Sequence, residues 1–366
     1  MDVVLTDNAL ELTVAPGDTR VFDNFWLRDN CPSAFHPDTA ERVFDILSVP
    51  NDLRIDRAQL ENEELIVQWA DDQHASRYPL AWLLRFGASL GSPLPMLWRA
   101  DIMERLVPVT FNDALGTAAG LENWLTQLTT RGFSIMEGCP LRADGILDIT
   151  GLIGPPQPTN FGTVFDVVSK QTPNNNAYTA IQLFPHSDLP NWRCPPDFQF
   201  LYCLENDALG GESVLVDGFS VADALRVAQP DAFDVLTRVN AMFRFHDETA
   251  DIRFRAPVIG LDETGAVNEI RLNPGVMGAL DTPGDDARAF YLAYRQFVAL
   301  TRDPTFELTL SLAPGDMLGF DNLRVLHGRC AFDPSTGARH LRGCYVERDF
   351  VLSKLRLLTR DREIAA

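Results

Sequence analysis

The sequence predicts an α+β protein with a barrel or jelly roll at the centre of its larger domain. Short β-type runs fill the first 90 residues, and after them strands and helices follow one another irregularly, unlike the regular alternation that builds a parallel α/β sheet. The apolar fraction of 46%, with 23 Phe and 6 Trp, suffices for a sizeable buried core. A charged fraction of only 22% argues against global disorder.

The length of 366 residues suggests two domains, at roughly 100 to 200 residues per domain. We expect a small, mainly β N-terminal domain over residues 1–90 and a larger domain over residues 91–366. The Gly-, Ser- and Pro-rich stretch 87–95 is the expected linker, because such residues interrupt regular structure.

The small domain is predicted from apolar runs that turn residues separate. Residues 9–14, 21–27 and 65–69 are the expected strands, and residues 16–18 (Pro-Gly-Asp) form one of the turns. The segment 78–84 (Tyr-Pro-Leu-Ala-Trp-Leu-Leu) ends this domain.

The larger domain opens with a predicted helix. Apolar residues at i, i+3, i+4 and i+7 over residues 121–128 mark one helical face, and Gly132 supplies the stop before a strand at 133–136. Ser220 is the predicted N-cap of a helix that reaches about Val227.

The C-terminal part combines one long helix with further strands. Apolar residues on one face predict a helix over residues 287–298, and its aromatic side chains are expected in the core rather than at a cofactor. Strands follow at 306–312 and 317–320, joined by the turn 313–316.

The net charge of −20 disfavours nucleic acid and anionic membranes as partners and favours a cationic substrate. Solubility or adaptation to salt is the simpler explanation of the same charge. The six cysteines are scattered, as free thiols in a reducing compartment are. No signal peptide and no apolar run of 18 residues is visible, so we expect a cytoplasmic protein without a membrane span.

A possible metal site comes from His186 and Asp188, two residues apart after a β-type run at 178–184. On a strand such residues point to the same face, so an imidazole and a carboxylate converge. A distant histidine, His327, follows a predicted strand and completes two histidines and one carboxylate, which leaves three positions open on iron(II). The spacing alone is weak, since His36 with Asp38 matches it and His246 nearly does.

An arginine accompanies this set. Arg339 lies two predicted strands after His327, where it can face the same cavity and bind a carboxylate through two hydrogen bonds. The alternative is that Arg329, Arg339 and Arg342 are ordinary surface charges.

Several ordered motifs together resemble the γ-butyrobetaine dioxygenase/trimethyllysine dioxygenase family, within the larger taurine-dioxygenase-like superfamily. The motifs lie at residues 174–179, 185–190, 210–213, 216–219, 326–329 and 339–341, with 26–31 and 78–82 in the small domain. The resemblance therefore covers nearly the whole chain.

The resemblance implies a double-stranded β-helix, or jelly-roll, catalytic domain with flanking helices. It implies that His186, Asp188 and His327 bind iron(II), and that Arg339 binds the far carboxylate of 2-oxoglutarate with Ser213 nearby. The implied reaction uses iron, 2-oxoglutarate and O2, releases succinate and CO2, and hydroxylates an unactivated C–H bond of a small molecule.

The family recognises a quaternary ammonium group with aromatic side chains, because a cation without N–H groups is bound by ring faces. The matching positions are Phe161, Phe165, Tyr178 and Tyr345, and two are Phe where the best-known enzymes have Tyr and Trp. Both Phe residues could instead pack a core.

The substrate's anionic end is expected to meet Asn175, which matches an Asn that contacts the substrate carboxylate. A second Asn usually follows soon after the position of Asn273 and is missing here. Conversion of γ-butyrobetaine to carnitine is the leading expectation, and a trimethylammonium phosphonate, trimethyllysine or another amine-bearing acid stays open.

Structural zinc is common in the small domain of this family, through three Cys and one His. Here only Cys31 remains, Ser33 stands at a usual Cys position, and His36 and His74 are the other candidates, so we expect no structural zinc. A homodimer is compatible with the family. A cupin-like metal isomerase that works without 2-oxoglutarate, and a non-catalytic binder, are the alternatives from other classes.

Overall fold

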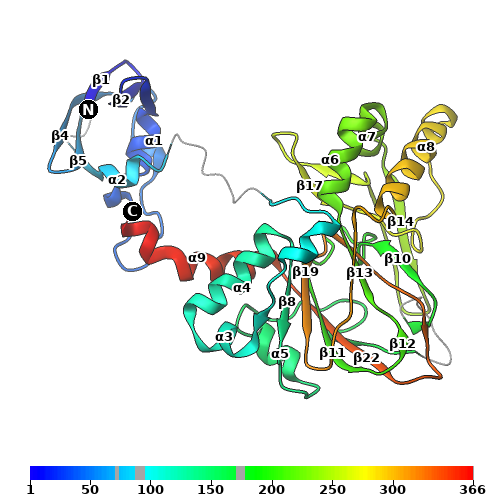
Figure 1. The fold of residues 1–366 in the computed structure, drawn as a ribbon. Coiled ribbons are helices and arrows are strands. Elements are labelled where there is room, and N and C mark those ends of the chain that lie inside the picture. The colour runs from blue at the N-terminus through cyan, green and yellow to red at the C-terminus, as the bar shows by residue number, and fades with distance from the viewer. Residues whose placement is uncertain (71–73, 87–94, 170–177, 366) are drawn as a thin grey trace. The chain divides into compact units, whose positions relative to one another are not determined.

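The computed structural model describes residues 1–70, 74–86, 95–169 and 178–365 (Figure 1). The chain divides into two compact units, Met1–Ser92 and Pro93–Ala366. The predicted domain boundary at residue 90, and the expected linker up to residue 94, lie outside the described residues. No helix in the described ranges is both long and apolar enough to cross a membrane.

The smaller unit contains two three-stranded antiparallel sheets, in the orders β1-β2-β3 and β4-β5-β6. Alternate residues of β2 and β5 point into a shared core with the aromatic rings of Trp69 and Tyr78. The elements are β1 (Asp2–Leu5), β2 (Ala9–Ala15), β3 (Asp18–Asp23), α1 (Asn24–Asp29), β4 (Ile55–Glu61), β5 (Glu64–Trp69), β6 (Ala75–Pro79) and α2 (Leu80–Leu83), with 3-10 turns at Pro32–Ala34 and Ile46–Ser48.

The predicted strand over 21–27 is wrong in its second half, where α1 begins after β3. The Asp23 carboxylate accepts hydrogen bonds from the backbone N–H groups of Phe25 and Trp26, at 2.8 and 3.2 Å. Such an N-cap stabilises a helix start that an apolar run alone does not reveal.

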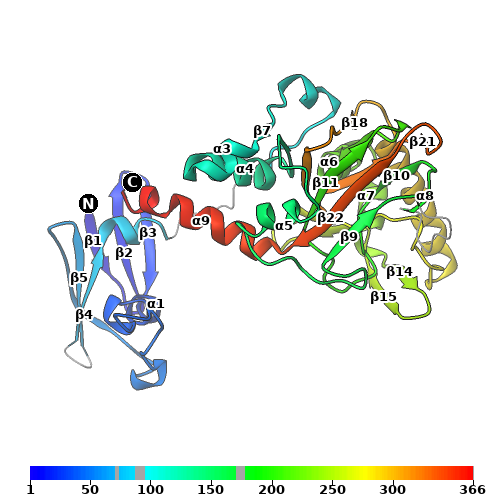
Figure 2. The same cartoon turned by 90° about the horizontal axis from the view of Figure 1, so that it is seen from below.

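The larger unit is built on two sheets, as a jelly roll is, and the predicted α+β class is confirmed. The order β7-β8-β19-β11-β22-β9 forms a six-stranded sheet, and Figure 2 shows β22 between β11 and β9. The order β10-β20-β13-β18 forms the other sheet. Their strands are β7 (Val109–Thr110), β8 (Phe133–Glu137), β9 (Val164–Val167), β10 (Leu183–His186), β11 (Phe198–Asn206), β13 (Ser213–Asp217), β18 (Glu307–Leu310), β19 (Met317–Asp321), β20 (Val325–Arg329) and β22 (Arg339–Val346).

Strand β11 shows how the six-stranded sheet uses its two faces. Phe198, Phe200 and Tyr202 pack against the flanking helices, while Gln199 and Leu201 point the other way. Trp124 of α4 meets Phe200 with 5.9 Å between ring centres. The helices of this region are α3 (Phe111–Gly116), α4 (Ala118–Thr130), α5 (Gly145–Thr150) and α9 (Arg348–Ala365), with a 3-10 turn at Ala100–Arg105.

A second helical cluster, α6 to α8, shares a core with β16 and β17 (Figure 1). Ser220 lies inside α6, and the N-cap is Asp217, whose carboxylate accepts from the backbone N–H of Phe219 at 3.2 Å. The elements are α6 (Gly218–Ala228), α7 (Pro230–Arg238), α8 (Gly284–Thr301), β14 (Ala241–His246), β15 (Asp251–Ala256), β16 (Ile259–Leu261) and β17 (Val267–Ile270), and a further pair joins β12 (Leu209–Gly210) to β21 (Phe332–Asp333).

A buried ion pair joins several of these parts. Arg324, in the turn between β19 and β20, donates to both carboxylate oxygens of Asp217 at 3.0 and 2.8 Å. Its remaining N–H groups donate to the carbonyls of Thr130 and Met96, at 2.8 and 2.7 Å. The side chains of Arg324 and Asp217 are only 2% and 0% exposed, so the hydrogen bonds replace almost all of their water.

We expect Arg324→Met to lower the free energy of unfolding by about 3 to 5 kcal/mol, because it leaves the Asp217 carboxylate buried without its counter-ion. Urea denaturation followed by circular dichroism measures the change. Arg238→Met is the matched control, since Arg238 also pairs with carboxylates but is half exposed, and its midpoint should hardly move. Equal losses in both variants would contradict the assigned importance of burial.

Candidate active site

A cavity of about 480 Å³ lies between the two sheets of the larger unit. Strands of both sheets contribute to its walls: Gln199 and Tyr345 come from the six-stranded sheet, and His186, Ser213 and His327 from the other. The inward face of each sheet therefore supplies polar side chains to one cavity.

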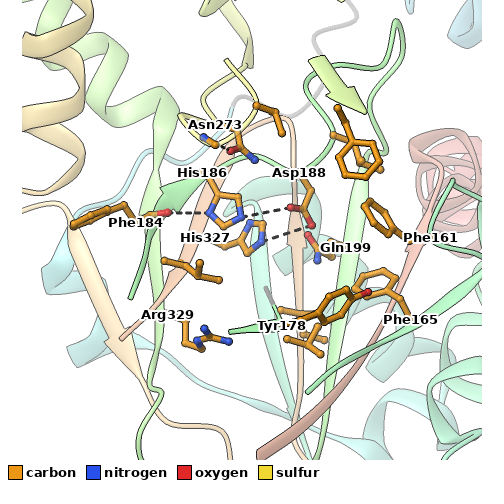
Figure 3. A pocket seen from close by; sticks show the side chains of 18 of the residues that line it. Phe161, Phe165, Tyr178, Phe184, His186, Asp188, Gln199, Asn273, His327 and Arg329 are labelled. Carbon is orange, nitrogen blue, oxygen red and sulfur yellow. Dashed lines mark hydrogen bonds and ion pairs between the residues drawn. The ribbon is translucent and has the colours of Figure 1, made fainter. Parts of the chain in front are cut away.

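His186, Asp188 and His327 come together in this cavity (Figure 3). The antiparallel pairing of β10 with β20 sets His186 opposite His327, and their ring centres lie 4.4 Å apart. Asp188 Oδ1 lies 3.5 Å from His186 Nε2, and Asp188 Oδ2 lies 3.7 Å from His327 Nε2. The three ligand atoms lie within 4.8 Å of one another, so one metal ion can contact all three.

The strand prediction around these ligands needs correction. The run 178–184 is not one strand, because β10 begins only at Leu183, and Asp188 lies beyond its end. His327 lies within β20 rather than after a strand. His186 and Asp188 therefore converge because the chain turns after β10, and not because alternate side chains of one strand point to the same face.

Hydrogen bonds and burial set the protonation of the two imidazoles. His186 Nδ1 lies 2.9 Å from the carbonyl oxygen of Phe184, which only accepts, so Nδ1 carries a proton and Nε2 faces Asp188. Burial lowers the pKa of His186, but the Asp188 carboxylate outweighs it and raises that pKa above its ordinary value. Burial and the adjacent His186 lower the pKa of His327 to about 3, which keeps this ring neutral. Two imidazoles and one carboxylate are the donor set of non-haem iron(II) sites with open positions, so these residues fit such an ion.

Asp188 is fixed from both ends. Its backbone N–H donates to the side-chain oxygen of Asn322 at 2.6 Å, and the Asn322 amide donates back to the Asp188 carbonyl at 3.0 Å. The Tyr345 hydroxyl donates to Asp188 Oδ2 at 2.8 Å. Burial raises the pKa of Asp188, but the two histidines and Tyr345 outweigh it and hold the pKa well below its usual range.

The side chain of Arg271, which is 5% exposed, forms hydrogen bonds with the loop that follows Asp188. Its guanidinium donates to the carbonyls of Pro190, Trp192 and Arg193 at 3.1, 2.8 and 3.0 Å. These bonds restrict the segment that carries the carboxylate ligand.

Arg329 and Arg339 are buried, at 5% and 8% exposure, so the surface-charge interpretation is wrong for both. Their guanidinium carbons lie 4.9 and 5.7 Å from the ring centre of Phe332. Burial and the nearby Arg339 lower the pKa of Arg329 to about 10. Arg329 donates to the carbonyls of Thr179 and Ile181, at 2.7 and 2.9 Å, and both buried cations share the cavity wall with Ser213, an arrangement suited to an anion.

A glycine makes room for Arg339. Its Nε donates to the carbonyl of Gly211 at 3.1 Å. Gly211 has a φ of +78°, and a Cβ there would lie 2.7 Å from Arg339 Nε. Arg342, by contrast, forms an ion pair with Asp166 and does not line the cavity.

The predicted aromatic residues Phe161, Phe165, Tyr178 and Tyr345 all line the cavity. Phe165 packs on Tyr345 with 5.2 Å between ring centres, and Figure 3 shows Phe161, Phe165 and Tyr178 on the side of Asp188 away from Phe184. Phe245 of β14 packs edge-to-face against Phe161, with 5.3 Å between ring centres. Asn175 lies outside the described residues.

Sequence reasoning missed several polar residues of the cavity, among them Gln199, Asn191 and Arg244. Gln199 is 2% exposed, and it is the single polar residue in the apolar run 198–204, which is a signal for an inward-facing functional position. Asn191 and Arg244 have other polar residues near them in the sequence, so neither is conspicuous as a single polar residue in an apolar run.

Of the remaining histidines, His246 lines the cavity, and the other three lie elsewhere. His36 accepts backbone hydrogen bonds within its own turn, and His340 bonds Asp166 at 2.8 Å. In the smaller unit, His74 Nε2 lies 3.5 Å from Cys31 Sγ and 3.1 Å from Ser33 Oγ. Within the described ranges, only the set of His186, Asp188 and His327 has three such side chains placed for a metal.

Comparisons with known proteins give two family matches. The model for "Taurine catabolism dioxygenase TauD, TfdA family" matches residues 92–345. The model for "Gamma-butyrobetaine hydroxylase-like, N-terminal" matches residues 3–84.

Individual proteins are similar over nearly the whole chain. A gamma-butyrobetaine dioxygenase of Pseudomonas sp. (strain AK-1) is 38% identical, covering 96% of this chain and 94% of that protein. A mitochondrial trimethyllysine dioxygenase of Rattus norvegicus is 31% identical, covering 96% of this chain and 86% of that protein. Among solved structures, an asparagine oxygenase in complex with Fe(II), 3-hydroxyasparagine and succinate is similar in fold, with a TM-score of 0.50, 19% identity and coverage of 73% of this chain and 88% of that one.

We expect Tyr345→Phe to weaken Fe(II) binding by about 10- to 100-fold, because it removes the hydroxyl that orients Asp188 while keeping the ring. Anaerobic Fe(II) titration measures the affinity. Tyr294→Phe is the control, since Tyr294 lies in α8 away from the cavity. Unchanged affinity in Tyr345→Phe would show that the hydrogen bond does not support the metal site.

Proposed function

The chain belongs to the taurine catabolism dioxygenase TauD, TfdA family, and on that premise we propose that it hydroxylates a small quaternary-ammonium acid, with γ-butyrobetaine converted to carnitine as the preferred reaction. It is a dioxygenase that uses Fe(II) and 2-oxoglutarate. The supporting observation is that one cavity contains the metal-binding set, two buried arginines and a group of aromatic rings.

The proposed ligands of the iron are His186, Asp188 and His327. Bound iron with 2-oxoglutarate and O2 supplies the oxidising chemistry that protein side chains lack. The chain's own part is to hold the ligands through Asn322, Arg271 and Tyr345, and to exclude bulk water from the cavity.

Arg339 is the proposed partner of the far carboxylate of 2-oxoglutarate, with the Ser213 hydroxyl on the same wall. Among the described residues, no carboxylate forms an ion pair with Arg339, which instead donates to a single carbonyl. A guanidinium in this situation gains most from a carboxylate that brings two oxygens. This feature favours the oxygenase over a cupin-like isomerase, which needs no such residue.

The proposed site of the trimethylammonium group is formed by Phe161, Phe165, Tyr178 and Tyr345. Ring faces attract a quaternary cation through the aromatic quadrupole, by up to ~2 kcal/mol when water is excluded. The net charge of −20 also favours the approach of cations. A trimethylammonium phosphonate and trimethyllysine share this group, and relatives named trimethyllysine dioxygenase keep the latter as the second candidate.

We also propose a reducing, cytoplasmic setting. All six cysteines are free thiols, and four of them are buried. Thiols distributed in this way are common where disulfides do not form.

We expect succinate release to depend on substrate and to be fastest with γ-butyrobetaine in a panel that includes trimethyllysine and a trimethylammonium phosphonate. The physical reason is that the aromatic group binds the common cation, while the length and charge of the rest decide the fit. Quantification of succinate and hydroxylated product by mass spectrometry measures it. If no trimethylammonium compound stimulates succinate release in the iron-loaded protein, the proposed substrate class is wrong.

We expect Arg339→Met to raise the KM for 2-oxoglutarate by about 10- to 100-fold, because charge-assisted hydrogen bonds are lost. Steady-state kinetics with varied 2-oxoglutarate measures the change. Arg342→Met is the control on the same strand, since Arg342 pairs with Asp166 outside the cavity. An unchanged KM in Arg339→Met would favour an enzyme that does not use this cosubstrate.

A further inference from the structure

The substrate's carboxylate is expected to meet Asn175, which lies outside the described residues, and the described part of the cavity offers further polar groups. In Figure 3, Asn273 and Arg329 lie on opposite sides of the imidazole pair. Arg329 and Arg339 belong to the end that we assign to 2-oxoglutarate. Among the other described residues that line the cavity, Arg244 is the single arginine.

Strand β14, which carries Arg244, contacts both the turn after Asn273 and the aromatic group. Its backbone N–H donates to the carbonyl of Val276 at 2.7 Å, which fixes β14 beside that turn. The next residue, Phe245, packs its ring against Phe161 at 5.3 Å. A substrate whose ammonium group contacts Phe161 therefore lies beside the strand that carries Arg244.

The neutral amides at this end are already engaged with the backbone. Asn273 donates to the carbonyl of Ser187 at 3.2 Å and accepts from the N–H of Gly275 at 3.0 Å. Asn191 donates to the carbonyl of Ile252 at 3.3 Å. A carboxylate that leaves water needs strong, preferably charged, donors, and a guanidinium offers two parallel N–H groups.

We propose that Arg244 binds the carboxylate of the substrate and so determines the preference for an acid, an inference that rests on the proposed function. In the structure, Arg244 Nε and NH2 donate to the two oxygens of Asp251, at 2.7 and 2.8 Å. Asp251 thus accepts the same two hydrogen bonds from the guanidinium that, in this proposal, the substrate carboxylate accepts.

The exchange of one carboxylate for the other costs little. The side chains of Arg244 and Asp251 are 44% and 49% exposed, and exposed ion pairs contribute little to stability. Arg244 can therefore release Asp251 when a substrate arrives, and Asp251 competes with the substrate in its absence.

The experiment compares γ-butyrobetaine with its neutral primary amide in Arg244→Met. We expect the KM for the acid to rise by up to about fivefold while the KM for the amide and kcat change little, since only the acid loses the charge pair with this half-exposed guanidinium. Arg253→Met is the matched control, because Arg253 is the register partner of Arg244 on β15 and does not line the cavity. It should leave both KM values unchanged.

Asp251→Asn tests the same assignment with Arg244 intact. Removal of the competing carboxylate should lower the KM for γ-butyrobetaine several-fold and leave that for the amide unchanged. If wild-type protein hydroxylates γ-butyrobetaine, and folded Arg244→Met keeps the wild-type preference for the acid or Asp251→Asn leaves its KM unaltered, the inference is overturned. Wild-type protein that hydroxylates no trimethylammonium acid overturns the proposed function, and this inference with it.

Discussion

The antiparallel pairing of β10 with β20 sets His186 directly across from His327, and the candidate active site depends on that register. A shift of one residue would turn one imidazole to the other face of the sheet. Asp188 lies past the end of β10, so its position depends on Asn322, which bonds both the N–H and the carbonyl of that residue. Two chain segments far apart in sequence must therefore pair correctly before any metal can bind.

The buried arginines fall into two kinds by what surrounds them. Arg324 and Arg271 meet carboxylates and several carbonyls, so their charges are balanced within the fold. Arg339 has one carbonyl and, among described residues, no carboxylate within ion-pair distance. Since a buried charge without a partner is costly, the fold retains at Arg339 a charge that an anionic ligand can balance. The contrast separates arginines whose charge is balanced within the fold from one that is suited to an anionic ligand.

Much of the fold was predictable because it follows local rules. The helix over 121–128 lies within α4, and the strand over 133–136 lies within β8, since apolar periodicity and Gly132 act locally. Helix N-caps were harder to predict. Asp23 caps a helix where a strand was expected to continue, and Asp217, not Ser220, is the N-cap of α6. The cavity contained the predicted histidines, Asp188 and aromatic residues, but Arg271 and Asn322 act through partners distant in sequence, which no local pattern reveals.

Under the proposed role of Arg339, the absence of a side chain at Gly211 links sequence variation in this turn to cosubstrate affinity. Any larger residue there would have to adopt a left-handed backbone and would push against the guanidinium of Arg339. Such a variant could keep the jelly roll intact and still respond poorly to metabolic levels of 2-oxoglutarate. Among natural or engineered variants, a substitution at this position would therefore raise the KM for 2-oxoglutarate rather than lower the stability of the fold.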